Sequence, residues 1–261
     1  MRTDASFGKN RLGILGGMGS EATAYFLRLL AQRAGARVDQ DHVPFLLLSC
    51  PEIPDRSAAI ENGDTIVPTM IHARLAQLAR AGCGAVAIAC NTAHYWRDEF
   101  AAALRIPFID MISATARQTA LSGAGSAIVL GTRSTIRYRL YDHALTDAGV
   151  RLIEPEDEIV ELTSAAISLS KAGDLPGASA QLARSLAACE ALHADAVILG
   201  CTELPMVVPE GTRGIHLVDS VSCLAEACVQ WWRAKSMPDQ GMETRLRPMP
   251  TQSKSVWYHA K

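Results

Sequence analysis

Two cysteines, each at the end of a short apolar run, are the residues of this sequence best placed to do chemistry. Cys90 follows residues 85–89, and Cys201 follows residues 196–200. Short, continuously apolar runs of this kind predict buried parallel strands. Because ligands bind beyond the carboxyl ends of the strands in open α/β sheets, we expect both thiols at a binding site.

The two thiols occupy equivalent positions of an internal repeat. Three pairs of corresponding residues show nearly the same separation along the chain: Leu15 with Leu130, Cys90 with Cys201, and Asp110 with Asp219. Such a repeated series predicts two similar α/β halves. A single cysteine at a strand end is more often a small core residue. A repeated one favours a functional role in a cleft shared by the halves.

Polar residues after each cysteine favour acid–base chemistry. Asn91 and Thr92 follow one thiol, and Thr202 and Glu203 follow the other. They supply side-chain donors and precede helical or turn segments whose free N–H groups favour an anion. We expect this setting to lower a thiol pKa from about 8.5 toward neutral pH, where proton-transfer catalysts work best. Two thiols on opposite faces of one carbon could racemise it, one removing the proton and the other delivering one, without any cofactor in principle.

A racemisation also needs groups that stabilise the negative charge developing at the substrate carboxylate. Small-residue turns follow the first predicted strand of each half and could supply backbone donors. The candidates are Met18 and Gly19 in the turn of residues 16–19, the turn at Gly131, and the hydroxyls of Thr92, Thr132, Ser134, Thr135 and Thr202.

The elements that must position these residues alternate between strand and helix. Strands are predicted at residues 11–15, 43–50, 85–89, 107–110, 127–132, 150–153, 196–200 and 215–219. Helices are predicted at residues 21–34, 64–81, 93–104, 112–121, 135–148, 156–172, 177–193 and 221–234, with a loop at 51–56. We predict an α/β fold of two pseudo-symmetric domains with mainly parallel sheets and a site in the cleft between them. The predicted domains are residues 11–113 plus about 220–235, and residues 114–219, flanked by a frayed leader (1–10) and a flexible or loosely docked tail (236–261).

Composition and charge exclude several classes of protein. The chain has 261 residues, is 49% hydrophobic and carries a formal net charge of −2, so nothing favours nucleic acid or a membrane surface as a partner. We find no apolar run near the about 20 residues of a membrane span, and no signal peptide, so a cytoplasmic protein is expected. The seven cysteines are odd in number and widely spaced, and no secretion signal is found, which argues against a disulfide framework. They include no C-x-x-C pair, which argues against a zinc site.

Three segments, residues 13–19, 90–94 and 199–204, resemble the aspartate/glutamate racemase family, whose members work without pyridoxal phosphate. The resemblance covers roughly residues 11–233. It implies a two-domain pseudo-symmetric α/β fold, a cleft between the domains, no cofactor and usually a homodimer. It also implies a paired-cysteine mechanism with Cys90 and Cys201 as the two bases.

Further site residues follow from this resemblance. Arg56 resembles the family's arginine that binds a substrate carboxylate, and an exposed loop charge is the alternative. Lys171 stands where the family often has a lysine near the side-chain carboxylate, and a solvated lysine at a helix end is the alternative. Glu203 occupies the place of a histidine in glutamate racemases, which favours the aspartate branch. Arg133, in the second small-residue turn, either restricts the pocket or points outward.

The sequence therefore predicts a cofactor-independent racemase of a small acidic amino acid, aspartate first and glutamate second. A hydantoin racemase, a decarboxylase or a cis–trans isomerase on the same scaffold stays open. A nicotinamide-binding module is a remote alternative, since residues 17–22 satisfy G-x-G-x-x-G/A but Asp39 precedes the second strand instead of ending it. A cysteine hydrolase pairing Cys90 with His94 is disfavoured because Cys90 ends a strand, so we expect a packed or capping His94. A non-enzymatic binding protein is the remaining alternative.

Overall fold

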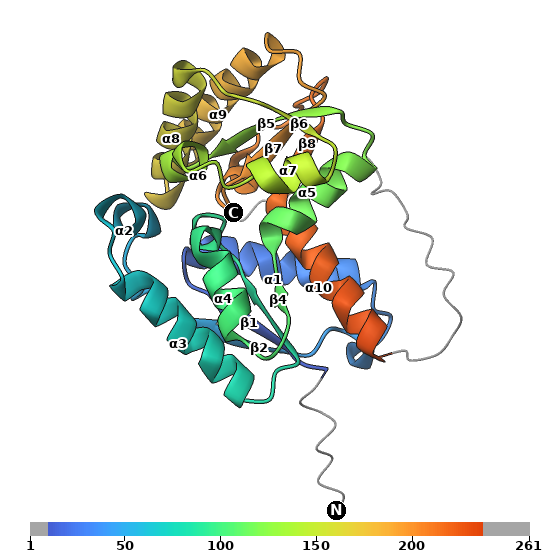
Figure 1. Cartoon of the computed structure of the whole chain (residues 1–261). Coiled ribbons are helices and arrows are strands. Elements are labelled where there is room, and N and C mark those ends of the chain that lie inside the picture. Colours follow the sequence, from blue (N-terminus) through green and yellow to red (C-terminus); the bar gives the residue numbers. More distant parts are fainter. Residues whose placement is uncertain (1–9, 237–261) are drawn as a thin grey trace, which may run out of the picture.

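The computed structural model describes residues 10–236, which form two four-stranded sheets, one from each half of the chain (Figure 1). Apart from residues 10 and 236, the predicted leader and tail lie outside this range. No helix within it has both the length and the apolar composition needed to cross a membrane.

The two sheets repeat one topology. In the first sheet the order is β2-β1-β3-β4, built from β1 (Leu12–Gly16), β2 (Phe45–Ser49), β3 (Ala85–Ile88) and β4 (Phe108–Ile109). In the second the order is β6-β5-β7-β8, built from β5 (Ser126–Gly131), β6 (Arg151–Ile153), β7 (Ala196–Gly200) and β8 (Leu217–Asp219). All strand pairs are parallel. The predicted fold class, two parallel-sheet α/β units, is confirmed.

Helices cover both faces of each sheet, which explains the continuously apolar central strands. On the first sheet, α3 (Ile66–Arg80) and α4 (Arg97–Ala103) lie on one face, while α1 (Ser20–Ala34) and α10 (Ser220–Ser236) lie on the other. On the second sheet, α5 (Met111–Leu121) and α7 (Asp142–Asp147) cover one face, and α8 (Asp157–Lys171) and α9 (Leu175–Glu190) cover the other.

Two of these helices cross between the halves. The chain enters α5 directly after β4, yet Ile112 and Ala116 pack into the core of the second sheet. After β8 the chain returns through α10, where Leu224 and Cys228 pack against the first sheet beside α1. Figure 1 shows this return as the orange α10 lying next to the blue α1. Each sheet is therefore completed by a helix that connects it to the other half.

Two details of local structure differ from the prediction. Residues 51–55 form the predicted loop, but a helix that was not predicted, α2 (Arg56–Asn62), begins at Arg56, and its N-cap Asp55 accepts a hydrogen bond from the Ala58 N–H at 2.9 Å. The single helix predicted at 135–148 is divided into α6 (Arg133–Arg137) and α7, with Arg139 between them at a φ of 52°. The break lets Tyr141 turn into the interior, where it is 2% exposed.

The helix predicted at 93–104 also differs in detail. It begins as a 3-10 turn, η2 (Thr92–Trp96), and continues as α4 from Arg97. The tighter turn places the residues that follow Cys90 against the second half, a contact that becomes important at the site.

Candidate active site

Both cysteines lie where the strand order of their sheets makes ligand binding most favourable. Cys90 follows β3 and Cys201 follows β7, and each strand neighbours the first strand of its half, β1 or β5. These neighbours form the topological switch point of each sheet, where a crevice opens beyond the carboxyl ends. The two switch points therefore present equivalent thiols.

The two thiols line one cavity. The cavity opens to solvent, and its empty volume is about 300 Å³ when the solvent at its mouth is included. Each cysteine is 5% exposed. The lining residues come from both halves of the chain: Met18, Asp55, Arg56, Ser57, Cys90, Asn91, Thr92, Thr132, Lys171, Cys201, Thr202 and Glu203. The structure thus brings together most of the residues that the sequence singled out.

Three predicted site residues lie outside this lining. Gly19 sits just behind it, since a Cβ there would be 3.2 Å from Glu203 Oε1. Thr135 lies behind Thr132, whose Oγ1 accepts a hydrogen bond from the Thr135 N–H at 3.2 Å. Ser134 is fully buried, and its hydroxyl has no hydrogen-bond partner among residues 10–236.

Sequence reasoning missed two lining residues, Asp55 and Ser57. Both flank Arg56 at the start of α2. The available signal was the capping pattern, because an aspartate three residues before an apolar helical segment often marks a helix start. Recognising α2 would have placed all three side chains on one turn.

A carboxylate lies beside the second thiol. Cys201 Sγ donates a hydrogen bond to Glu203 Oε2 at 3.0 Å, and Thr202 Oγ1 donates to the same oxygen at 3.0 Å. Burial first, and then the negative charge of Glu203, raise the pKa of Cys201 well above its ordinary value, against a weaker opposing effect of Lys171. The expected lowering of this thiol's pKa is therefore wrong, because burial and an anion outweigh the nearby backbone donors.

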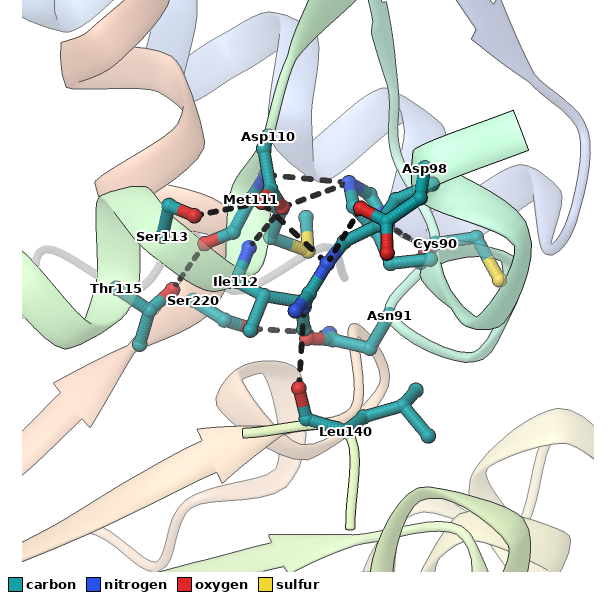
Figure 2. A network of polar contacts seen from close by, with 12 residues as sticks. Cys90, Asn91, Asp98, Asp110, Met111, Ile112, Ser113, Thr115, Leu140 and Ser220 are labelled. Carbon is teal, nitrogen blue, oxygen red and sulfur yellow. Dashed lines mark hydrogen bonds and ion pairs between the residues drawn. The ribbon is translucent and has the colours of Figure 1, made fainter. Parts of the chain in front are cut away.

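His94 holds the backbone of Cys90 in place. Its Nδ1 lies 2.8 Å from the Cys90 carbonyl oxygen, and the Met111 N–H donates to its Nε2 at 3.1 Å. Since Nε2 accepts, Nδ1 carries the hydrogen and donates to Cys90. Figure 2 shows the Cys90 sulfur turned away from this polar network. The expectation of a packed histidine is confirmed, and the imidazole does not face the thiol as a hydrolase base would.

The cavity lining contains two cations, Arg56 and Lys171, and two acidic residues, Asp55 and Glu203. The Arg56 guanidinium donates to the carbonyl oxygens of Met18 at 3.1 Å and Pro54 at 3.1 Å, which fixes it at the wall. Lys171, the last residue of α8, also reaches the lining. Arg133 instead forms an exposed ion pair with Glu161 and points outward. The available positive charge at the cavity therefore comes from Arg56 and Lys171.

The glycine-rich turn after β1 packs closely against the backbone at Cys50. Gly17 has a φ of 87°, and a Cβ on it would lie 2.4 Å from the backbone nitrogen of Cys50. Asp39 lies exposed in a short 3-10 turn, Asp39–Asp41, ahead of β2. Since no acidic residue ends β2, this arrangement does not support the nicotinamide-binding alternative.

Comparisons with known proteins agree with this geometry. The model of the Asp/Glu/Hydantoin racemase family matches residues 15–228. The broad specificity amino-acid racemase RacX of Bacillus subtilis (strain 168) is 28% identical over 227 residues, covering 85% of this chain and 98% of RacX. The structure of Picrophilus torridus aspartate racemase is similar at a TM-score of 0.76 and 32% identity, covering 85% of this chain and 94% of that one. A putative Asp/Glu racemase from Yersinia pestis gives a TM-score of 0.73 at 25% identity, covering 85% and 98%.

Proposed function

The chain belongs to the Asp/Glu/hydantoin racemase family and is an amino-acid racemase, and on this premise we propose that it racemises a small acidic amino acid, aspartate first and glutamate second, without a cofactor. One observation carries the proposal: two thiols from equivalent strand ends line a single cavity. A pair of acid–base groups, one from each half, is what proton exchange at a stereocentre requires.

The proposed reaction moves one proton at each face of Cα. Cys90, as a thiolate, removes the proton and becomes a thiol, leaving a carbanion stabilised by the substrate carboxylate. Cys201, as a thiol, donates its proton to the opposite face and becomes a thiolate. The carboxylate of Glu203 and the raised pKa of Cys201 support Cys201 as the group that holds the proton before the first turnover. The reverse reaction starts from the exchanged protonation states.

Polar groups on the cavity wall suit the α-carboxylate and the ammonium group. We assign this role to Asn91, Thr92, Thr132 and Thr202, with backbone support from Met18 and Gly19 and indirect support from Ser134 and Thr135 behind Thr132. Hydrogen bonds that are fixed before the reaction stabilise the charge that develops at the carboxylate.

The second carboxylate of the substrate is assigned to the two cations. Arg56 presents a planar guanidinium that matches a carboxylate, and Lys171 adds a charge from the end of α8. The similarity to an aspartate racemase of known structure further favours aspartate.

The experiment that tests this function follows Cα proton exchange in deuterated water. Purified protein is incubated separately with each enantiomer of aspartate and of glutamate, and optical rotation and deuterium incorporation are recorded. We expect racemisation by the wild-type protein and its loss in Cys90→Ser and Cys201→Ser. A serine variant that still exchanges the proton of one enantiomer supports the two-sided mechanism, and two serine variants as active as the wild type would refute it.

A broader substrate range is the second candidate. It is favoured by the similarity to RacX and by the presence of Asp55 and Glu203 in the lining, which offset the two cations. The same exchange assay with neutral and basic amino acids and with a 5-substituted hydantoin separates this candidate, the hydantoin racemase and the acidic racemase. Release of carbon dioxide would indicate a decarboxylase. The homodimer and the cytoplasmic location stay predictions. Sedimentation of the purified protein tests the homodimer.

A further inference from the structure

A buried chain of hydrogen bonds runs behind the cavity from one half to the other. The Tyr141 hydroxyl donates to Asn91 Oδ1 at 2.5 Å, Asn91 Nδ2 donates to Ser220 Oγ at 3.0 Å, and Ser220 Oγ donates to the Leu199 carbonyl at 2.7 Å. All three side chains are at most 2% exposed. Figure 2 shows the Asn91–Ser220 contact beside Cys90.

The direction of every bond in this chain is determined. Ser220 has a single hydroxyl hydrogen, and the Leu199 carbonyl can only accept it, so Ser220 must accept from the Asn91 NH₂ group. The carboxamide oxygen then faces Tyr141, whose hydroxyl must donate. Burial raises the pKa of Tyr141, so the hydroxyl keeps its hydrogen. This orientation of the Asn91 carboxamide keeps all three bonds, because a flipped amide would place its oxygen against the Ser220 oxygen, whose hydrogen is already donated to Leu199.

The chain connects the two thiols. Asn91 directly follows Cys90, and Leu199 belongs to β7, the strand that leads into Cys201. Neighbouring contacts join the segment after Cys90 to other parts of the second half: Thr92 Oγ1 lies 3.1 Å from Thr132 Oγ1, and Arg97 donates to the Leu140 carbonyl at 3.1 Å. The segment after Cys90 is therefore attached to the second half by several polar contacts, of which the Tyr141 chain is the most buried.

We propose that Tyr141 is a positioning residue for the racemase: by holding the Asn91 carboxamide, it fixes Cys90 relative to Cys201 across the cavity. This inference rests on the proposed two-thiol function. Tyr141 does not line the cavity and acts only through Asn91. Proton transfer from and to opposite faces of one carbon depends on the placement of both sulfurs, and a shift near 1 Å can cost on the order of 100-fold in rate.

The first test is Tyr141→Phe, which removes only the hydroxyl and keeps the buried ring. We expect kcat for racemisation to fall on the order of 10- to 100-fold and KM to rise by a smaller factor, because only Asn91 is released while Thr92, Thr132 and Thr202 remain in the wall. The matched control is Ser185→Ala, which removes a buried hydrogen bond to Thr163 of 2.8 Å between α8 and α9, away from the cavity. An equal, small change of kcat in both variants would overturn the proposal.

A double-mutant cycle tests whether Tyr141 and Ser220 both act through the Asn91 carboxamide. Tyr141→Phe and Ser220→Ala remove the two partners of Asn91, so the double variant should be little slower than the slower single variant. Fully additive losses in kcat would show that Tyr141 does not act through Asn91, and would overturn the proposal.

A third readout does not depend on racemase activity. Each cysteine's rate of alkylation by iodoacetamide is measured by peptide mass spectrometry in the wild type and in Tyr141→Phe. We expect Cys90 to react faster by on the order of threefold, while the core residues Cys189, Cys223 and Cys228, at most 2% exposed, keep their rates. An unchanged alkylation rate at Cys90, or an equal increase of the rate at all four cysteines, would overturn the proposal. A wild-type protein inactive toward every amino acid tested would refute the proposed function, and the Cys90 rate would still decide the inference.

Discussion

The carboxylate of Glu203 accepts the hydrogen of the Cys201 thiol across 3.0 Å. At Cys90 the neighbouring side chain, His94, instead donates a hydrogen bond to the backbone carbonyl of the cysteine, and Cys90 lines the cavity. The repeat therefore places two thiols symmetrically but surrounds them differently, and this difference can be measured.

Replacing Glu203 with Gln should lower the pKa of Cys201. The neutral amide removes the anion that disfavours the thiolate, while burial, the larger cause of the raised pKa, remains. The measurement is the pH dependence of Cys201 alkylation, whose midpoint should move to lower pH. Glu161→Gln, at an exposed ion pair with Arg133, is the control and should leave the midpoint in place. An unmoved midpoint in the Glu203 variant would show that the carboxylate does not influence the thiol.

Replacing Arg56 with Ala should weaken binding of acidic substrates. A hydrogen-bonded charge pair contributes about 1.5–3 kcal/mol, so KM for aspartate should rise roughly 10- to 100-fold. Arg56→Lys should recover only part of the loss, because an ammonium cannot make the planar two-point contact. The control is Arg74→Ala, which removes an exposed arginine that pairs with Glu52. A KM equal to that of the wild type would remove Arg56 from the substrate site.

His94 should make the stability of the protein depend on pH. Burial lowers the pKa of its imidazole from 6.5, so the folded state keeps it neutral while the unfolded chain gains a proton as the pH falls through that value. The free energy of unfolding should therefore decrease below about pH 6.5 and down to the folded pKa, by up to about 1.4 kcal/mol per pH unit from this group.

Urea unfolding of the wild type and of His94→Gln, at about pH 7.5 and about pH 5.5, measures this contribution. The variant should lose less stability than the wild type over this interval. His42→Gln, at an exposed histidine, should behave as the wild type does. If the free energy of unfolding depends on pH equally in His94→Gln and in the wild type, the neutral buried imidazole is not the source of the loss of stability at low pH.

Gly17→Ala should destabilise the protein strongly. The new Cβ would meet the Cys50 nitrogen at 2.4 Å in a backbone with a φ of 87°, so we expect a loss of about 2–4 kcal/mol together with loss of racemase activity. Gly63→Ala separates the two causes, because Gly63 has a φ of 64° and nothing within 4 Å of its would-be Cβ. That control should lose only about 1–2 kcal/mol, the cost of the left-handed backbone alone. Similar losses in both variants would contradict the close approach at Gly17.

Local pattern and repetition in the sequence were enough to predict that the two cysteines lie at strand ends beside one cavity. Cys90 and Cys201 end continuously apolar strands, and those strands are apolar because helices cover both faces of each sheet. The repeat then placed both residues at equivalent strand ends. Nothing beyond period and spacing was needed to expect them near one cavity.

The parts that failed depend on contacts between distant segments. Tyr141 lies in a stretch with a helical pattern, but its burial beside Asn91 breaks that helix, and no local signal reports this contact. The pKa of Cys201 likewise depends first on how deeply the folded chain buries the thiol, and then on the direction in which the Glu203 side chain turns. Sequence spacing places such residues near each other without specifying which atoms meet.

The crossing helices have a consequence for folding. α10 shares with α1 the cover over Leu12 and Ile14 of the first sheet, and α5 shares with α7 the cover over Ala127 and Ile198 of the second. Neither half can complete its own interior, so we expect the two to denature as one cooperative unit. Although the enzyme is built from two similar halves, it is in this respect indivisible, and the chain must be synthesised as far as α10 before the active site can form.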